Sequence, residues 1–391
     1  MRRGFKFKLY PNSGQEAALS VALETHRRLY NAALEQRITA YETEKRSVGF
    51  SEQCRGLTER RKENAYLDRV NATGCQGTLR RLDHAFQSFF RHVREGTGKP
   101  GFPRFKGKDR FNSFAFPAYG DGVKLHVGEH PKLYVQHVGE VRIRLHRPVE
   151  GKIKTVTVKR EAGKWYAVFS CELPDVAAPD RRADPATGID LGLERFLTAA
   201  DGSVVANPRF LKGSLPELRR RQRALARAKR GSGRRRKTKS RVTQCYARVA
   251  NQRRDFHHKT ALDLIRRYGF VAVEDLDVRE LGSSGPHRMN RAIHDAGWSQ
   301  FVGILKYKAE SAGTRVVVVE TRGTSQECSG CGTVVPKTLR DRKHTCPVCG
   351  LSLHRDENAA RNILARGLRA RTVPEGLNVD VGLHAPRSCL L

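Results

Sequence analysis

The sequence predicts a multidomain α+β protein, and three observations lead to this prediction. The chain has 391 residues, more than a single hydrophobic core usually organises. Patterns of period two and of period 3.6 follow one another along it in separate blocks. A stretch rich in Pro, Asp and Ala at 173–187 is typical of a linker. We therefore expect one part over residues 1–184 and a second part over residues 185–366.

The first part should combine a small antiparallel sheet with helices inserted into it. KFKLYP at 6–11 predicts a strand, and Asn12 or Ser13 then offers a cap for a helix. Apolar residues with helical spacing continue to Val93, so helices should occupy about 13–95. From 139 to 173 the pattern changes to strict alternation, which predicts three strands, the last two joined by a turn at EAGK.

The segment at 99–117 (KPGFPRFKGKDRFNSFAFP) interleaves phenylalanines with Lys and Arg and has no period. Such a composition suits stacking on bases and pairing with phosphates. A folded loop that buries its own phenylalanines would have the same composition, so both interpretations stay open. Arg104 and Lys106 are the candidate nucleic-acid contacts in this segment.

The second part should alternate strands and helices. We expect a hairpin at 188–205, a long helical pair at 215–268 that turns at GSG 231–233, a strand at 268–276, a helix at about 289–312, a strand at 314–322 and a last helix at about 357–368. The remaining residues, 367–391, carry no motif, and we expect a disordered tail there.

The net charge of the chain is its strongest compositional signal. Lys and Arg number 74 against 40 Asp and Glu, a formal charge of +34. A chain of this charge favours a polyanionic partner, of which nucleic acid is the most abundant. Thirteen Lys or Arg and no acid lie between Arg219 and Arg241. The candidate nucleic-acid contacts there are Arg219, Arg220, Arg221, Arg223, Arg227, Lys229, Arg230, Arg234, Arg235, Arg236 and Lys237.

Four of the nine cysteines form two CxxC pairs, Cys328 with Cys331 and Cys346 with Cys349. This pattern predicts a tetrahedral zinc site of four thiolates, which is structural because no coordination position stays open for water. The zinc ribbon should span about 324–352. His344 is a possible substitute ligand. We interpret the other cysteines as ordinary thiols, and we expect the protein to occupy a reducing compartment.

Three acids stand at the ends of predicted elements. Asp190 lies in the strand that opens the hairpin, Glu274 ends the apolar run VAVE, and Asp356 begins the last helix. Strands that bring carboxylates to one edge can bind hard divalent cations. Each acid also has an ordinary explanation: Asp190 as a turn former, Glu274 as a surface acid and Asp356 as a helix cap. From these residues alone, both interpretations stay open.

No run of eighteen apolar residues offers a membrane span, and the N-terminus lacks the apolar core of a secretory signal. We therefore expect no membrane partner and a cytoplasmic location, in a prokaryote and with the nucleoid when bound to DNA.

The motifs together resemble the TnpB family (OrfB), transposon-encoded RNA-guided nucleases related to the miniature type V CRISPR effectors. The resemblance covers the chain to about residue 366 and rests on KFKLYP, GFPRFKGK, GIDLGLERFLTAADG, VANQRRDFHHK, VAVEDL, AGWSQF, TSQECSGCG, CPVCG and HRDENAARNIL. His354 is a small departure, since many relatives have an acid at that position.

The resemblance implies a RuvC-like, RNase H-type nuclease domain with an inserted zinc ribbon, in which Asp190, Glu274 and Asp356 form the catalytic carboxylate triad. It implies catalytic Mg²⁺ or Mn²⁺ in a two-metal mechanism, beside the structural Zn²⁺. For the first part it implies a wedge β-barrel with an inserted helical recognition domain. The partners it implies are a guide RNA derived from the transposon end and a double-stranded target DNA with a short flanking motif. It names no protein partner.

Three alternatives to an RNA-guided DNA endonuclease stay open. The chain could be a catalytically silent RNA-guided DNA-binding protein, which the intact triad disfavours. It could be a transposase that performs strand transfer, although no second domain for DNA ends is recognisable. It could also be a resolvase that needs no RNA.

Overall fold

The computed structural model describes residues 2–96, 100–108, 110–174, 178–283, 285–320, 322–338 and 340–372, with side chains described to residue 370. The chain divides into two compact units, Met1–Val176 and Ala177–Leu391, so the division lies before the expected boundary at residue 184. Each unit is described by itself below.

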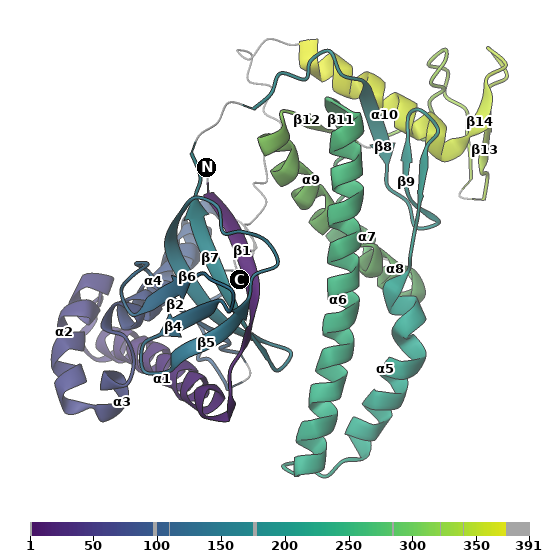
Figure 1. Ribbon diagram of the computed structural model, residues 1–391. Coiled ribbons are helices and arrows are strands. Elements are labelled where there is room, and N and C mark those ends of the chain that lie inside the picture. The colour runs from purple at the N-terminus through teal and green to yellow at the C-terminus, as the bar shows by residue number, and fades with distance from the viewer. Residues whose placement is uncertain are drawn as a thin grey trace. The chain divides into compact units, whose positions relative to one another are not determined.

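The first unit contains a seven-stranded antiparallel sheet with the order β2-β6-β7-β1-β5-β4-β3 (Figure 1). Its strands are β1 (Arg2–Tyr10), β2 (Ser113–Phe116), β3 (Val123–His126), β4 (Lys132–Val135), β5 (Gly139–Arg144), β6 (Lys152–Glu161) and β7 (Lys164–Glu172). Strand β1 lies between β7 and β5, and its alternate residues Phe5, Phe7 and Leu9 enter the core. The strands expected from period two are confirmed as β5, β6 and β7. The four-residue strands β3 and β4 were not predicted.

Four helices lie between β1 and β2 in the sequence: α1 (Ser13–Glu44), α2 (Phe50–Glu63), α3 (Ala65–Asp68) and α4 (Ala72–Glu95). Asn12 caps α1 through a reciprocal pair of bonds with Gln15, in which each side chain accepts from the other residue's backbone N–H. This confirms the expected cap and the helical block over 13–95.

The phenylalanines of the 99–117 segment take two different roles. Phe111, Phe114 and Phe116 are buried in the core of the first unit. Phe102 and Phe105 are about half exposed, at 47% and 52%. Stacking on bases is therefore available to the last two rings and not to the first three.

The second unit is built on a five-stranded sheet with the order β10-β9-β8-β11-β12. Its strands are β8 (Ala186–Asp190), β9 (Arg195–Ala199), β10 (Val204–Ala206), β11 (Phe270–Glu274) and β12 (Arg315–Val319). Strands β8, β11 and β12 run parallel, whereas β9 and β10 are antiparallel additions at one side. The expected hairpin and both later strands are confirmed.

Side chains alternate between the two faces along each strand, so both faces of this sheet present apolar residues. Helices cover both faces. Val271 and Val273 of β11 pack in the cluster that holds helices α6 (Gly233–Arg267) and α9 (Trp298–Ala312). Phe270 and Ala272 pack on the other side with Ile363 of α10 (Arg355–Thr372). The result is a three-layer unit with the parallel strands at its centre.

Helix α10 approaches the sheet unusually closely at glycines. A Cβ on Gly188 of β8 would lie 2.2 Å from the Ala360 carbonyl oxygen, and one on Gly367 would lie 2.5 Å from the Ala272 methyl. Both glycines therefore remove a side chain where helix backbone and strand meet.

The remaining helices differ from expectation at their ends. The helical pair is α5 (Phe210–Arg227) and α6, joined around GSG as expected. The single helix expected at 289–312 is wrong: Gly297, with φ +66°, separates α8 (His287–Ala296) from α9, and α7 (Val278–Leu281) precedes them.

Helix α10 extends to Thr372, so residues 367–372 are helical and not tail. The rest of the expected tail, 373–391, lies outside the described residues. Among the described helices, none combines the length and apolar character needed to cross a membrane.

The end of the expected linker is docked on the second unit. The Arg181 guanidinium donates to the carbonyl oxygens of Ile265 and Arg266, the last turn of α6, and to Thr314 Oγ1. Arginine at a helix C-terminus satisfies carbonyls that have no partner within the helix. The predicted linker at 173–187 contains the division between the two units, but Arg181 contacts the second unit and residues 186–187 belong to β8.

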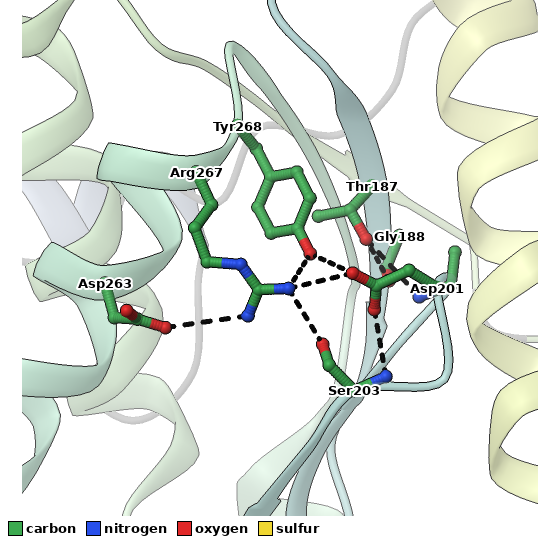
Figure 2. A network of polar contacts seen from close by, with 8 residues as sticks. Thr187, Gly188, Asp201, Ser203, Asp263, Arg267 and Tyr268 are labelled. Atoms are coloured by element: carbon green, nitrogen blue, oxygen red, sulfur yellow. Dashed lines mark hydrogen bonds and ion pairs between the residues drawn. The ribbon is translucent and has the colours of Figure 1, made fainter.

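A polar network fixes the start of β11 to the β9–β10 turn (Figure 2). The Asp201 carboxylate accepts bonds from the Tyr268 hydroxyl (2.6 Å), Arg267 Nη2 (2.8 Å) and the Ser203 backbone N–H (2.9 Å). Desolvation raises the pKa of Asp201, but the bonds from Ser203 and Tyr268 outweigh it and lower the pKa to about 2. The end of α6 is thereby held against the β9–β10 turn before the chain enters β11.

Candidate active site and metal centre

Asp190 and Glu274 lie on one face and one edge of the sheet. Each is the last residue of its strand, and the strands are parallel neighbours in which Ile189 pairs with Val273. Because Gly188 and Ala272 face α10, the alternation of side chains places Asp190 and Glu274 on the same α10 side. Parallel strands thus deliver two carboxylates to one carboxyl edge.

Asp356 joins them from the first turn of α10. It is 8% exposed, and its carboxylate lies 3.8 Å from Arg355 Nε and 3.7 Å from His354 Nδ1. The Asp356 backbone N–H donates to His354 Nδ1 at 3.2 Å. His354, the departure noted in the sequence, therefore contacts Asp356 and leaves it in place.

The charges of Glu274 and Asp356 both act on Asp190. Burial raises the pKa of Asp190 well above its usual value, and the nearby charges of Glu274 and Asp356 raise it further, against Arg355. Burial also raises the pKa of Glu274, although a hydrogen bond from Thr324 and the charge of Arg366 oppose this rise. Like charges in a partly dry site are the arrangement expected where a cation is to bind.

The three carboxylates are more widely spaced than the ligands of a single compact ion site. Within the described part of the chain, the four cysteines alone form a group of three or more metal-ligating side chains whose ligand atoms all lie within 4.8 Å of one another. A pair of ions about 3.5–4 Å apart needs carboxylates spread over a larger distance than this.

Cys328, Cys331, Cys346 and Cys349 converge on one point, as the sequence predicted. Cys328 Sγ lies 3.6 Å from Cys349 Sγ, and Cys331 Sγ lies 3.5 Å from Cys346 Sγ. Zn–S bonds of about 2.3 Å in a tetrahedron place sulfurs about 3.8 Å apart, so this group fits Zn²⁺. The short strands β13 (Lys343–Thr345) and β14 (Ser352–His354) complete the ribbon.

The local backbone explains why these cysteines converge. Gly332 (φ +79°) and Gly350 (φ +72°) follow the two CxxC pairs, in a backbone region that favours glycine. Their N–H groups donate to the carbonyl oxygens of Cys328 and Cys346, which closes each turn. His344, the possible substitute ligand, is fully buried but is not part of the sulfur group.

The cationic residues expected to contact nucleic acid lie mostly exposed on α5, α6 and their connection. The exposed ones are Arg219, Arg220, Arg223, Arg227, Lys229, Arg230, Arg234, Arg236 and Lys237. Two others make contacts within the helical pair: Arg221 binds Glu217 Oε1 and the Arg241 carbonyl, and Arg235 binds the carbonyls of Leu225 and Ala228. These two arginines stabilise the hairpin itself.

Of the two candidate nucleic-acid contacts in the first unit, one is exposed and the other makes contacts within the unit. Arg104 is exposed. The backbone of Lys106 exchanges hydrogen bonds with Asn31 of α1, and its carbonyl also accepts from Arg27. The Lys106 ammonium lies 5.5 Å from the ring centre of Tyr30, and burial lowers its pKa. Lys106 is thus partly a structural residue.

Sequence reasoning did not identify Thr324, which contacts Glu274, or Asn358 and Asn362, which contact the segment that carries Thr324. Thr324 Oγ1 donates to Glu274 Oε1 at 2.6 Å, and both asparagine side chains are buried. A usable signal was present: polar residues spaced four apart in a helix that also packs apolar residues on a sheet.

Comparison with known families agrees with this arrangement. A family described as a probable transposase (OrfB_IS605) matches residues 168–284, and the Cas12f1-like TNB domain matches residues 298–363. A model described as a helix-turn-helix domain matches residues 1–46, where this structure has strand β1 and the single helix α1.

Two relatives align along nearly the whole chain. One from Streptomyces pristinaespiralis is 35% identical over 390 residues, covering 96% of this chain and 92% of the relative. One from Escherichia coli K12, InsQ, is 30% identical over 381 residues, covering 93% and 92%. Both are named "Putative RNA-guided DNA endonuclease". A solved structure of the mini-RNA-guided endonuclease CRISPR-Cas phi3 has the same overall fold, with a TM-score of 0.54 at 10% identity over 94% of this chain and 92% of that one.

The fold and the cysteine group define a class: multidomain α+β proteins with acidic residues at the carboxyl edge of a sheet and a four-cysteine group that fits a zinc ribbon. Within that class the chain belongs to the TnpB (OrfB) family, which confirms the resemblance seen in its motifs.

Proposed function

We propose that this protein is an RNA-guided DNA endonuclease that hydrolyses phosphodiester bonds of target DNA, with Asp190, Glu274 and Asp356 as its catalytic carboxylates. The observation that carries the proposal is their convergence. The three acids are 84 and 82 residues apart in sequence, yet the charges of Glu274 and Asp356 add to burial in raising the pKa of Asp190, which supports their grouping at one sheet edge. Membership of a family whose relatives are named as endonucleases supports the same activity.

The three carboxylates would hold divalent cations, Mg²⁺ or Mn²⁺. When bound, such ions activate a water molecule and stabilise the leaving oxygen of a phosphodiester. The residues of this chain provide the surroundings: Glu274 and Asp356 are nearly excluded from solvent, at 9% and 8% exposure. Arg355 and Arg366 moderate the repulsion between the acids, since their charges lower the pKa of Asp190 and of Glu274 respectively.

The four cysteines would hold a structural Zn²⁺. The four sulfurs complete a tetrahedron, so no position is left for a reacting water. The ribbon precedes α10 directly in the sequence, and zinc would therefore fix the start of that helix and the position of Asp356 in its first turn.

The architecture we propose follows the family. The second unit is the RuvC-like, RNase H-type nuclease domain with the zinc ribbon inserted between β12 and α10. The first unit is the wedge domain, with α1 to α4 as its inserted recognition domain. Its antiparallel sheet and helical block support this assignment.

A guide RNA and a double-stranded DNA would be the partners. The net charge of +34 and the exposed cations of α5 and α6 support binding through phosphates. The guide would read the target by base pairing, while the protein reads only a short flanking motif. We propose that the guide derives from the end of the transposon that encodes the protein.

The decisive experiment compares the wild type with Asp190→Ala. The protein is purified with its co-expressed RNA, supplied with Mg²⁺ and offered matching DNA with varied flanking motifs. We expect cleavage by the wild type and none by Asp190→Ala, with RNA binding unchanged. Asp255→Ala is the matched control, because Asp255 is exposed on α6 and should leave cutting intact. Equal cutting by Asp190→Ala would overturn the assigned mechanism.

The description of the matching family as a probable transposase makes strand transfer the second candidate. A joining assay with transposon ends decides between them. Joined products from the wild type would favour transfer, whereas linear cut products alone would favour hydrolysis.

A further inference from the structure

One hydroxyl group contacts the carboxylate cluster without belonging to it. Thr324 is 4% exposed, and its Oγ1 donates to Glu274 Oε1 at 2.6 Å. The last torsion of a glutamate side chain is broad, so an unpartnered carboxylate rotates freely. A bond to one oxygen restricts that rotation and sets the direction of the other oxygen.

The backbone of Thr324 is itself held by α10. The Asn362 side-chain amide donates to the Thr324 carbonyl at 2.8 Å and to the Glu327 carbonyl at 2.7 Å. One turn earlier, the Asn358 amide donates to the same Glu327 carbonyl at 2.7 Å, and its oxygen accepts from the Ser329 N–H at 2.9 Å. Buried amides with every contact satisfied are rigid connectors.

Arg366 continues the same row of α10 side chains. Its Nη1 donates to the carbonyls of Glu320 and Arg322 at 2.9 and 2.8 Å, and its Nη2 binds Glu327 Oε2 at 3.0 Å. Positions 358, 362 and 366 are four residues apart, so they lie along one face of the helix. This row therefore supplies hydrogen bonds to the carbonyls of Glu320, Arg322, Thr324 and Glu327.

The geometry therefore links three features of the molecule. Helix α10 carries Asp356, holds the segment that carries Thr324, and through that segment reaches Cys328, the first zinc ligand. We infer that Thr324 is a positioning residue for Glu274, held by Asn358 and Asn362, and that the base of the zinc ribbon thereby orients one catalytic carboxylate toward the metal ions. This inference rests on the proposed function.

The test is direct metal binding by the purified protein–RNA complex. Thr324→Val removes the donor at nearly constant volume, and Thr324→Ser keeps it. Free Mn²⁺ is measured by electron paramagnetic resonance during a titration, and DNA cleavage is measured across Mg²⁺ concentrations. We expect Thr324→Val to weaken Mn²⁺ binding by about tenfold or more, the usual effect of losing a partner of a metal ligand. Its cleavage should recover partly at high Mg²⁺, and Thr324→Ser should bind Mn²⁺ within about twofold of wild type.

Controls separate positioning from folding. Thr243→Val on the exposed face of α6 removes a hydroxyl that only bonds its own helix, and should change neither measurement. Thermal unfolding and RNA binding are recorded for every variant. If Thr324→Val does not fold, Asn362→Leu serves instead, because it removes both bonds to the Thr324 segment and should weaken Mn²⁺ binding in the same direction.

Two outcomes would overturn the inference: wild-type Mn²⁺ affinity in a folded Thr324→Val or Asn362→Leu variant, or equal loss in Thr324→Val and Thr324→Ser. The Asp190→Ala variant distinguishes the two levels. If Asp190→Ala is inactive while Thr324→Val binds Mn²⁺ normally, only the positioning role fails. If Asp190→Ala cuts normally, the proposed function fails first.

Discussion

The surroundings of Asp190 in the folded protein disfavour its ionised carboxylate. Its carboxylate is removed from water and placed near two further acids, which raises its pKa well above the usual value. Glu274 shares this condition, with its own pKa raised mainly by burial. Sites that violate local electrostatic preference in this way are typically functional. The proposed binding of a cation here would offset the stability that this burial and repulsion cost.

Asp190→Asn should stabilise the metal-free protein. The folded-state pKa of Asp190 is raised, so above its ordinary value of 3.8 the unfolded chain releases a proton that the folded chain retains. Stability accordingly falls as pH rises through the interval between the ordinary and the raised pKa. A neutral amide removes this loss, and the melting temperature in chelator at neutral pH should increase, measured by thermal unfolding.

The same variant should lose its advantage when Mg²⁺ is added, since the wild type then gains bound metal and Asp190→Asn does not. Asp255→Asn, exposed on α6, is the control and should melt like the wild type. A lower melting temperature for Asp190→Asn in chelator would contradict the electrostatic account.

Single residues differed in how far the sequence could identify them. The four cysteines were predictable because their spacing alone specifies tetrahedral ligands. The three acids each had an ordinary alternative, and only the family resemblance grouped them. Thr324 could not be predicted, because its role depends on a bond to a residue 50 positions away.

At the scale of elements, the contact between α10 and the sheet determines the site. Gly188 lies two residues before Asp190 on the same face of β8, and the helix backbone at Ala360 passes directly over it. The first turn of that helix presents Asp356. The spacing between β8 and α10 therefore also sets the separation between the Asp190 and Asp356 carboxylates.

Gly188→Ala should destabilise the second unit and impair cleavage. Its Cβ would lie 2.2 Å from the Ala360 carbonyl oxygen and 2.4 Å from the Leu364 nitrogen, so the helix must move. Overpacking of this kind costs about 1–3 kcal/mol, which denaturant unfolding would measure. Cleavage should fall further than the lost stability explains, because Asp356 moves with α10.

Gly303→Ala is the matched control for that variant. Gly303 lies inside α9 of the same unit with no atom near its would-be Cβ, and alanine there should be neutral or stabilising by up to about 1 kcal/mol. Wild-type stability in Gly188→Ala would show that the helix tolerates the added methyl and that its close approach is not required.

Elements with a long, regular pattern were the predictable ones. Strands β6 and β7 and helices α1, α4 and α6 follow from period and capping. Strands β3 and β4 are four residues each, too short for a period to register. The break between α8 and α9 depends on the positive φ of Gly297, where a Cβ would lie 3.0 Å from Arg253 Cδ, a contact that only the fold creates.

For the whole molecule, charge and its distribution decide the partners. Part of the excess of +34 lies where α5, α6 and their connection present nine exposed cations of the predicted set. Helix α6 has 35 residues and so extends about 50 Å, from this cationic end to the strand that carries Glu274. Composition predicted the class of partner. It could not predict where the chain divides, because the docking of Arg181 on α6 is a tertiary contact.

Neutralising the cationic helical pair should weaken RNA binding in a salt-dependent way. We compare Arg234, Arg236 and Lys237 changed together to Ala with the wild type, by measuring the dissociation constant for RNA at several salt concentrations. Each lost phosphate contact should reduce the slope of log K against log salt by about 0.7–0.9.

The control variant removes the same charge elsewhere in the second unit, with Arg291, Lys306 and Lys343 changed to Ala, all exposed. Its slope should change less. Equal slopes for the two triple variants would mean that net charge alone, rather than the helical pair, binds the RNA.

The packing of α10 onto β8 also determines when, during synthesis, the proposed catalytic site can form. Asp356 is synthesised 166 residues after Asp190. At about 5–20 residues per second, ribosomes need about 8–33 s to add that interval. During this time the sheet edge carries an incomplete set of ligands. A nascent chain that has not reached Asp356 therefore lacks one carboxylate of the proposed catalytic site, and the proposed cleavage requires synthesis to pass that residue.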